Sequence, residues 1–265
     1  MRDENLIEVR GLNSYYGKRQ VLFDINFSIP RHQITVIMGV SGCGKSTLLR
    51  HLIGLKWTYS GQILIDGGDL LGLDARGLET YRRRIGVLFQ SGALFNSLSV
   101  AENIIVPLKV HTRLSPETMR IIAQIKLHLV GLSDFGLYMP SQLSGGMRKR
   151  AGLARALAMD PEILFVDEPS SGLDPITAAG LDDLILELRD TLGMTIIVVT
   201  HELESAFQIA DQIVVLDKGR ILVAGSPKEV QGSKEERVVQ FLQRRADQQQ
   251  LDTEAYLASL MDMSA

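Results

Sequence analysis

The sequence has little cysteine, no long apolar run and no large excess of charge of one sign. Cys43 is the single cysteine among 265 residues, which excludes an internal disulfide bond and a zinc cluster built from cysteines. No apolar run approaches the roughly 18 residues that a membrane-spanning helix requires. The formal net charge is −3, from 28 basic and 31 acidic residues, so no overall basic field is available to hold nucleic acid or anionic lipid.

The composition that remains is that of an ordinary globular protein. Hydrophobic residues make up 45% and charged residues 22% of the chain, which argues against a disordered chain or a long coiled coil. A chain of this length buries about three quarters of its unfolded surface, enough for one large domain or two modest ones. Residues 1–5 carry charges where a secretory signal needs an apolar stretch. We therefore expect a soluble, cytosolic protein.

Short apolar runs predict the strands of an α/β fold. Residues 7–29 alternate between apolar and polar, a pattern typical of an antiparallel hairpin. Residues 34–38, 163–166 and 195–199 are β-rich apolar runs, which favour strands buried on both faces. A helical pattern over residues 176–191 separates the last two runs, as expected of a crossover in a parallel sheet. We predict a helix over 45–55 as well.

The middle of the chain has a helical pattern instead. It runs from Leu98 to Ser141, with Ser115 as a helix N-cap, Pro116 at the first helical position and Gly131 just past the end. One helical stripe, which we interpret as ordinary core packing, consists of Ile121, Ile122, Ile125 and Leu129. We expect a helical subdomain over about 98–155, inserted into the α/β body.

The composition shifts after Gly225-Ser226-Pro227 towards Lys, Glu, Arg and Gln. We therefore expect a main domain over 1–227 and a helical tail over 228–265. Two short apolar faces lie in this tail: Val238, Phe241 and Leu242, then Tyr256, Leu257, Leu260 and Met261. Isolated helices below about 12–15 residues are marginal in water. We expect residues 251–261 to dock on a protein surface, whether the chain's own body, a second copy or a small partner.

A phosphate-binding loop follows the first buried strand. Glycines let successive backbone N–H groups turn inward around a phosphate, and the following helix N-terminus adds its dipole. In this P-loop pattern Lys45 reaches the β- and γ-phosphates, the Ser46 hydroxyl ligates Mg²⁺, and Cys43 occupies a free position as a small tolerated residue. The candidate nucleotide-binding residues are Gly39, Ser41, Gly42, Cys43, Gly44, Lys45, Ser46 and Thr47.

Two adjacent carboxylates end the apolar run 163–166. Asp167 is placed to hold Mg²⁺, mostly through water, and Glu168 to polarise a water for in-line attack on a γ-phosphate. Carboxylates at a strand end can be simple surface caps, but the phosphate loop in the same chain favours the Mg²⁺ interpretation. The sequence therefore predicts a site for ATP and Mg²⁺.

Further motifs follow in a fixed order along the chain. Gln90 lies between the phosphate loop and the helical segment, and residues 143–147 read Leu-Ser-Gly-Gly-Met. Residues 171–174 read Ser-Gly-Leu-Asp, and His201 follows the last buried strand. Together with Tyr16, these motifs closely resemble those of the ATP-binding cassette (ABC) family, over about residues 7–225. The resemblance implies a P-loop NTPase core with a parallel sheet, an N-terminal antiparallel β subdomain and an inserted helical subdomain.

The resemblance also implies roles for the matching residues. Gln90 matches the Q-loop glutamine, and His201 matches the switch histidine that contacts the γ-phosphate. Tyr16 matches the aromatic residue that stacks on adenine; the adjoining Tyr15 is the alternative for this role, and we favour Tyr16. The signature residues that would contact the γ-phosphate are Ser144, Gly145 and Gly146. The implied catalytic residues are Lys45, Gln90, Glu168 and His201, and the implied Mg²⁺ ligands are Ser46, Gln90 and Asp167.

One residue departs from the family pattern. The signature usually ends in glutamine, and Met147 cannot donate the corresponding hydrogen bond, so we expect retained but slow hydrolysis. Residues 89–95, Met147 and residues 167–175 resemble the branch that energises Mla/Mce-type bacterial lipid transporters. Two alternatives stay open: the ATPase of a small-solute importer, and a non-transport cassette ATPase acting on ribosomes or DNA. The signature and His201 exclude a metabolic P-loop kinase.

The same resemblance implies partners. We expect a homodimer of cassettes, a separate transmembrane permease, and a location on the cytoplasmic face of the bacterial inner membrane. An Mce-domain lipid-binding protein and a small STAS-like protein would accompany the permease, and nucleic acid would not be a partner. Residues 91–98 are expected to receive a permease helix, although Leu94 and Phe95 could instead pack in the subdomain core. The basic runs 82–84 and 148–150 are interpreted as solvated helix faces.

Overall fold

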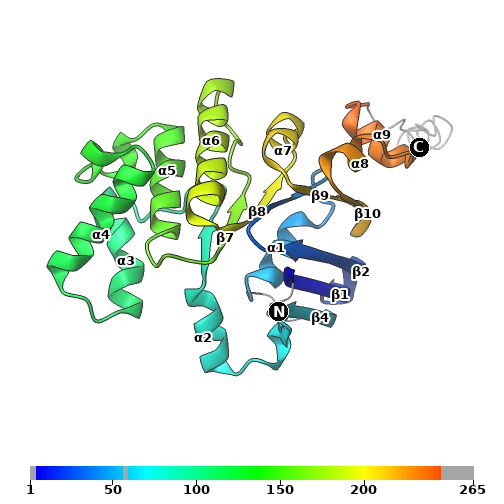
Figure 1. The fold of residues 1–265 in the computed structure, drawn as a ribbon, viewed down its shortest axis with the longest axis horizontal. Helices are drawn as coiled ribbons and strands as arrows, with labels where there is room; N and C mark the ends of the chain where they lie inside the picture. Colours follow the sequence, from blue (N-terminus) through cyan, green and yellow to red (C-terminus); the bar gives the residue numbers. More distant parts are fainter. Residues whose placement is uncertain (1–3, 56–58, 246–265) are drawn as a thin grey trace, which may run out of the picture.

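The computed structural model describes residues 4–55 and 59–245, which form two β-sheets flanked by helices (Figure 1). The first sheet is antiparallel, with strand order β2-β1-β4-β5. Its strands are β1 (Asn5–Tyr16), β2 (Arg19–Pro30), β4 (Tyr59–Ile65) and β5 (Gly68–Asp69). The pairing of β1 with β2 confirms the predicted hairpin. The pairing of β4 with β1 adds a segment that follows the phosphate loop in the chain.

The second sheet lies at the centre of the α/β body and has the order β10-β9-β3-β8-β7-β6. Its strands are β3 (Ile34–Met38), β6 (Ile85–Leu88), β7 (Ile163–Asp167), β8 (Thr195–Thr200), β9 (Gln212–Asp217) and β10 (Arg220–Gly225). The strands from β9 to β6 pair in parallel, as predicted, and β10 adds an antiparallel edge. Every residue of β3 and β8 is buried, which confirms the interpretation of these apolar runs.

Alternate residues of the central strands face two different hydrophobic cores. In β3, Ile34, Val36 and Met38 belong to the larger core, which includes residues of the helical segment. Ile37 belongs to the other core, between the central sheet, α1 (Lys45–Leu52) and the antiparallel sheet. Because side chains of a strand alternate between its faces, one apolar run supplies both cores. The carboxyl ends of β3, β7 and β8 are thereby fixed side by side.

The helices around the sheet include α1 (Lys45–Leu52), the short η1 (Leu70–Gly72), α2 (Ala75–Arg83), α6 (Pro175–Leu192) and α7 (Leu203–Ile209). Two of these helices, α1 and α6, begin near their predicted positions. The helix predicted over 176–191 is confirmed by α6. The helix predicted to reach Leu55 ends at Leu52, because Gly54 adopts a left-handed conformation (φ 66°) that stops a helix.

The predicted helical segment lies between β6 and β7, which are neighbours in the sheet. It contains α3 (Val100–His111), α4 (Pro116–Leu129), η2 (Ser133–Phe135), η3 (Pro140–Gln142) and α5 (Gly145–Ala156). The predicted ends of α4 are confirmed: the Ser115 hydroxyl accepts the Thr118 N–H, Pro116 is the first helical residue, and Gly131 adopts φ 72°. Figure 1 shows α3, α4 and α5 gathered at one end of the molecule.

The predicted apolar stripe of α4 is wrong for two of its four residues. Ile121 and Ile125 are each 56% exposed, whereas Ile122 and Leu129 pack partly buried against the core. The face that packs most deeply consists of Met119, Ala123, Lys126 and Leu127. These positions also have helical spacing, but the stripe contains a lysine, whose ammonium group pairs with Asp160 at the subdomain edge. The buried Lys126, paired with an exposed Asp160, therefore made the core-facing side look polar in the sequence.

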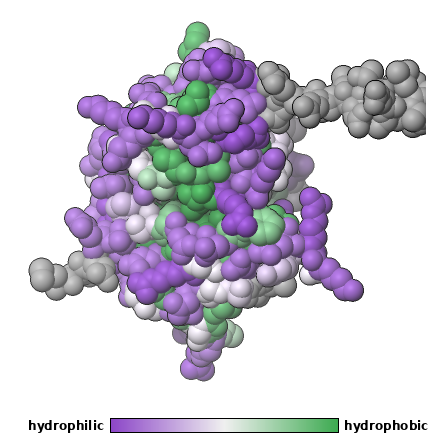
Figure 2. All heavy atoms as spheres, turned by 90° about the vertical axis from the view of Figure 1, so that its right-hand side faces the viewer, coloured by the Kyte–Doolittle hydropathy of each residue, from purple (hydrophilic) through white to green (hydrophobic). Residues whose placement is uncertain are grey.

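The last helices of the described residues are α8 (Pro227–Gln231) and α9 (Glu236–Leu242), beside β9 and β10. Val238 of the first predicted tail face is fully buried, and Phe241 and Leu242 pack partly buried against the larger core. Figure 2 views the molecule from this side and shows a band of hydrophobic residues within a largely hydrophilic surface. The predicted docking segment 251–261 lies outside the described residues. Within 4–55 and 59–245, no helix is both long and apolar enough to cross a membrane.

A buried carboxyl joins α6 to α7 and leads to a first prediction. Asp182 is 3% exposed and accepts a 2.6 Å hydrogen bond from the Ser205 hydroxyl. Burial raises the pKa of Asp182, with a further contribution from Asp183, so folding favours the protonated form. The stability that this group contributes is therefore present at acidic pH and is lost as the pH rises through its raised pKa.

Replacing Asp182 by asparagine keeps the shape and the acceptor while removing the buried charge. We expect Asp182→Asn to equal or exceed the parent in unfolding free energy at neutral pH, by up to about 1 kcal/mol. The difference should shrink towards about pH 4, near the ordinary pKa of a carboxyl. Urea unfolding at both pH values measures it. A variant that is markedly less stable at neutral pH would show that the charged form is the stabilising one.

Candidate nucleotide-binding site

The phosphate loop joins the end of β3 to the start of α1, in a conformation that requires glycine. Gly39, Gly42 and Gly44 have φ angles of 153°, 77° and 112°. A Cβ atom on Gly39 would lie 2.0 Å from the carbonyl oxygen of Leu216. A Cβ atom on Gly44 would lie 2.8 Å from Cδ2 of Leu22. Both the turn and its close packing therefore exclude a side chain, as a tight phosphate cradle requires.

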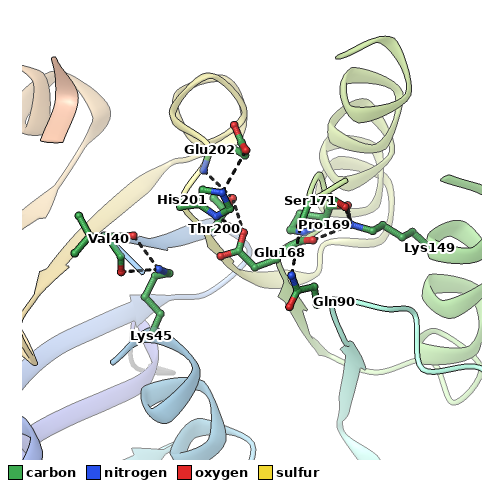
Figure 3. A network of polar contacts seen from close by, with 11 residues as sticks. Val40, Lys45, Gln90, Lys149, Glu168, Pro169, Ser171, Thr200, His201 and Glu202 are labelled. Atoms are coloured by element: carbon green, nitrogen blue, oxygen red, sulfur yellow. Dashed lines mark hydrogen bonds and ion pairs between the residues drawn. The ribbon is translucent and has the colours of Figure 1, made fainter. Parts of the chain in front are cut away.

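Lys45 places a positive charge over this loop. Its side chain is buried, and Nζ donates to the carbonyl oxygens of Gly39 at 2.8 Å and Val40 at 3.1 Å (Figure 3). Cys43 beside it is also buried, and burial raises the pKa of its thiol. A raised thiol pKa disfavours the thiolate nucleophile, which is consistent with a packing role for Cys43.

Asp167 fits a Mg²⁺ ion. It is the last residue of β7, and its Oδ1 is buried with no hydrogen-bond partner among the described residues. Burial and the neighbouring Glu168 raise the pKa of Asp167, while Lys45 and Arg50 oppose the shift. A buried acceptor without a donor is costly, and a hard divalent cation prefers oxygen ligands of this kind. The carboxylate is therefore placed to take Mg²⁺, directly or through water.

Glu168 has a strained backbone and a directed carboxylate. Its φ of 49° lies in the left-handed region, where a residue with a side chain is uncommon. Its backbone N–H donates to the carbonyl of Val199 at 2.8 Å. Its Oε2 lies 2.8 Å from Nδ1 of His201 and accepts a long hydrogen bond, 3.4 Å, from the Thr200 hydroxyl (Figure 3). The carboxylate at the end of β7 and the histidine after β8 thus form one polar pair.

A cavity of about 600 Å³ unites most of the predicted residues. Its wall comes from the phosphate loop, the ends of β7 and β8, and α9. The lining residues are Val21, Val40, Ser41, Gly42, Gly44, Lys45, Ser46, Thr47, Gln90, Asp167, Glu168, His201 and Phe241. Sequence reasoning missed Val21 and Phe241, because only the fold brings β2 and the last described helix beside the loop.

The signature residues lie apart from this cavity. Ser144, Gly145 and Gly146 are absent from its described lining. Ser144 is instead the N-cap of α5, where its hydroxyl accepts the Met147 N–H at 3.2 Å. The Met147 side chain packs partly buried against the larger core, which gives its apolar side chain a structural use. Within one copy of the chain, the signature and the phosphate loop therefore do not form a single site.

Tyr16 and Gln90 are placed differently from one another. Tyr16 ends β1, is 46% exposed, and its hydroxyl accepts a 3.2 Å hydrogen bond from Arg50. It is absent from the described lining of the cavity, so adenine stacking stays a prediction. Gln90 is exposed in the cavity wall, and its amide donates to the Ser171 hydroxyl at 3.3 Å (Figure 3). The Q-loop glutamine is thus in direct contact with the Ser-Gly-Leu-Asp motif of residues 171–174.

The interpretation of residues 148–150 as a solvated helix face is wrong for Lys149 and Arg150, whereas Arg148 is exposed. Lys149 is only 6% exposed. Arg150 is half-buried and donates to the carbonyls of Val130 at 3.1 Å and Gly180 at 2.6 Å. Backbone carbonyls from distant segments, which no sequence pattern reveals, supply the partners that allow these charges to be buried. The helix after the signature therefore connects several segments of the fold.

The geometry describes a P-loop ATPase cassette, and comparison with known proteins gives its family. Residues 22–171 match the family model described as ABC transporter, so the chain belongs to the ABC transporter family. The intermembrane phospholipid transport system ATP-binding protein MlaF of Haemophilus influenzae is 41% identical over 245 residues, covering 92% of this chain and 93% of that protein. MlaF of Escherichia coli strain K12 is 42% identical over 243 residues, with 92% and 90% covered.

Another relative carries a different name. The probable ribonucleotide transport ATP-binding protein mkl of Mycobacterium leprae is 43% identical over 240 residues, covering 90% of this chain and 69% of that protein. Among solved structures, cbiO1 of Clostridium perfringens, part of an ABC transporter complex, matches with TM-score 0.80 at 31% identity, covering 97% and 100%. A bacterial ABC transporter cassette solved as a dimer matches with TM-score 0.77 at 32% identity, covering 83% and 98%. These likenesses confirm the predicted fold class.

Proposed function

We propose that this chain is the ATP-hydrolysing subunit of a bacterial transporter that moves phospholipid between membranes. The observation that carries the ATPase proposal is the cavity in which Lys45, Asp167 and Glu168 converge. The phospholipid assignment is supported by the MlaF relatives, which match at 41–42% identity over 92% of the chain. The branch-specific residues 89–95 and Met147 support the same assignment.

In the proposed mechanism, each residue acts from the position that the structure gives it. Lys45 and the loop glycines bind the phosphates of ATP, and Ser46, Asp167 and Gln90 are placed to hold Mg²⁺. When bound, Mg²⁺ neutralises charge on the β- and γ-phosphates. The Glu168 carboxylate orients a water for in-line attack on the γ-phosphorus and accepts its proton, while the bond from that phosphorus to the bridging oxygen breaks and ADP leaves. His201 holds the Glu168 carboxylate through its 2.8 Å contact.

The cavity of one chain is incomplete under this proposal. Its described lining contains no signature residue, so Ser144, Gly145 and Gly146 would come from a second copy. Two copies would then enclose two ATP molecules, with Ser144 of one chain facing Lys45 of the other. The structural relative solved as a dimer supports this arrangement.

We further propose a separate permease and a position on the cytoplasmic face of the inner membrane. Mce-domain and STAS-like partners are part of the same proposal. Of the residues expected to receive the permease, Leu94 packs against the core, whereas Phe95 is 52% exposed. Phe95 also lies under Arg155, whose guanidinium carbon is 6.0 Å from the ring centroid. Phe95 is therefore the better test of docking than Leu94.

Replacing Phe95 by glutamate is expected to weaken assembly with the permease while leaving ATP binding intact. The change places a charge on an exposed apolar side chain and leaves the cavity lining untouched. Co-purification of the permease with the tagged chain, together with nucleotide binding, measures both effects. Leu137→Glu is a matched control, since Leu137 is 90% exposed and lies outside residues 91–98. Normal assembly by Phe95→Glu would remove this residue from the docking surface.

The transported molecule is tested with the whole complex. The chain is co-expressed with its permease, and the assembled complex is reconstituted into vesicles. ATP-dependent movement of a fluorescent phospholipid between two vesicle populations supports the proposal. ATP-dependent uptake of a ribonucleotide without phospholipid movement would support the function named for the mycobacterial relatives instead.

A further inference from the structure

Lys149 is the most heavily bonded buried cation near the site. It lies in the first turns of α5, right after the signature, and is 6% exposed. Its Nζ donates to the carbonyl oxygens of Glu168 at 2.9 Å, Pro169 at 2.5 Å and Ser171 at 2.7 Å (Figure 3). An ammonium group has three protons, so these carbonyls use its whole donor capacity. Lys149 therefore binds the chain itself and has no proton left for a ligand.

The three carbonyls belong to the turn that carries Glu168. Glu168 has a left-handed φ of 49°, a backbone conformation that costs free energy. It persists only when surrounding contacts hold the backbone in place. The turn's own hydrogen bond, from the Ser171 N–H to the Glu168 carbonyl, is long at 3.4 Å. The contacts of Lys149 are shorter and charge-assisted, and such bonds are stronger than those between neutral groups. They hold the turn in the conformation that directs the carboxylate towards His201.

We propose that Lys149 is a positioning residue for ATP hydrolysis: its ammonium group fixes the backbone of residues 168–171 and thereby the carboxylate of Glu168. The inference rests on the proposed ATPase activity. Because Lys149 belongs to the signature helix, the same contacts link the position of Ser144 to that of Glu168. If α5 moves when the dimer closes, the Lys149 side chain would therefore shift the Glu168 carboxylate with it.

The test compares Lys149→Met and Lys149→Arg in the full chain. Lys149→Met keeps the length and removes every donor, so kcat for ATP is expected to fall by about tenfold or more, the scale of a misplaced general base. KM for ATP should stay within about twofold, because Lys45 and the phosphate loop bind the nucleotide from another element. Lys149→Arg restores donors and charge and is expected to recover most of kcat.

Lys126→Met is the matched control. Lys126 is also a buried lysine of the helical segment, 7% exposed, but it pairs with Asp160 at the subdomain edge. The Lys126→Met variant should therefore have a lower melting temperature than the parent, with an unchanged kcat in the folded protein. Lys149→Gln, with a shorter side chain and two donors, serves if the methionine variant does not fold, and it is expected to lower kcat with KM unchanged.

Two results would overturn the proposal. One is an unchanged kcat in folded Lys149→Met. The other is a fall in kcat that a structural role alone explains, which would make Lys149 a stabilising residue only. Such a fall would be accompanied by an equal loss of ATP affinity, or would also occur in Lys126→Met at the same melting temperature. Failure of the ATPase proposal looks different, since the parent protein itself would then release no phosphate.

Discussion

Replacing Glu168 by glutamine is expected to lower ATP turnover by about 100-fold or more, because a positioned base is removed from the reacting water. Glutamine has the same shape and leaves Lys45, Ser46 and Asp167 in place around the cavity. ATP affinity should therefore stay close to that of the parent. Phosphate release measures turnover, and equilibrium binding of ATP measures affinity, both on the assembled transporter.

Glu202→Gln provides the control for this prediction. The Glu202 carboxylate lies 3.4 Å from Nε2 of His201, on the opposite side of the ring from Glu168, and is 43% exposed. Glu202→Gln removes one negative charge beside His201, just as Glu168→Gln does. We expect turnover within a few-fold of the parent, since Glu202 is absent from the described lining of the cavity. Near-normal turnover by Glu168→Gln would contradict the assigned role of Glu168.

Replacing Lys45 by alanine is expected to weaken ATP binding itself. The ammonium group is the buried cation nearest the loop glycines, and it also donates to the carbonyls of Gly39 and Val40. Hydrogen bonds of a charged group contribute about 1.5–3 kcal/mol, so the Kd for ATP should rise by roughly 10- to 100-fold. Turnover should fall at least as much, because the same charge is needed where negative charge develops on the phosphates.

Lys45→Ala and Glu168→Gln thus separate binding from chemistry. Titration with ATP should distinguish them, since only the lysine variant loses affinity. Lys18→Ala, which removes an exposed lysine at the first hairpin, is the control for loss of one positive charge. Unaltered ATP affinity in Lys45→Ala would mean that the cavity binds its phosphates by another group.

The parts of the fold that could be predicted are those determined by local sequence. The apolar run at 34–38 predicts a strand that is buried on both faces. The P-loop motif that follows predicts the positive φ angles of its glycines. Asp167 ends β7 and Glu168 follows it, because a continuous apolar strand precedes the two carboxylates. Ser115 and Gly131 begin and end α4 through capping chemistry contained in a few residues.

The parts that were not predictable depend on partners distant in the chain. Lys126 can be buried because its ammonium group pairs with Asp160. Lys149 can be buried because it donates to three backbone carbonyls between residues 168 and 171. Both lysines therefore look like surface residues in the sequence. Phe241 enters the cavity wall from the last described helix, and β4 joins β1 after the loop. The role of Ser144 is hidden even in the fold of one chain, since its partner site would belong to another copy.

The composite site is the central claim, and the mass of the ATP-bound species tests it most directly. The chain has a mass of 29.3 kDa. Light scattering of purified Glu168→Gln should show a monomer without nucleotide and a dimer of twice that mass with ATP and Mg²⁺. Adding Ser144→Arg to that variant should abolish the dimer, although the Lys45 cavity is unchanged. A parent protein that stays monomeric throughout full-rate ATP hydrolysis would contradict the account.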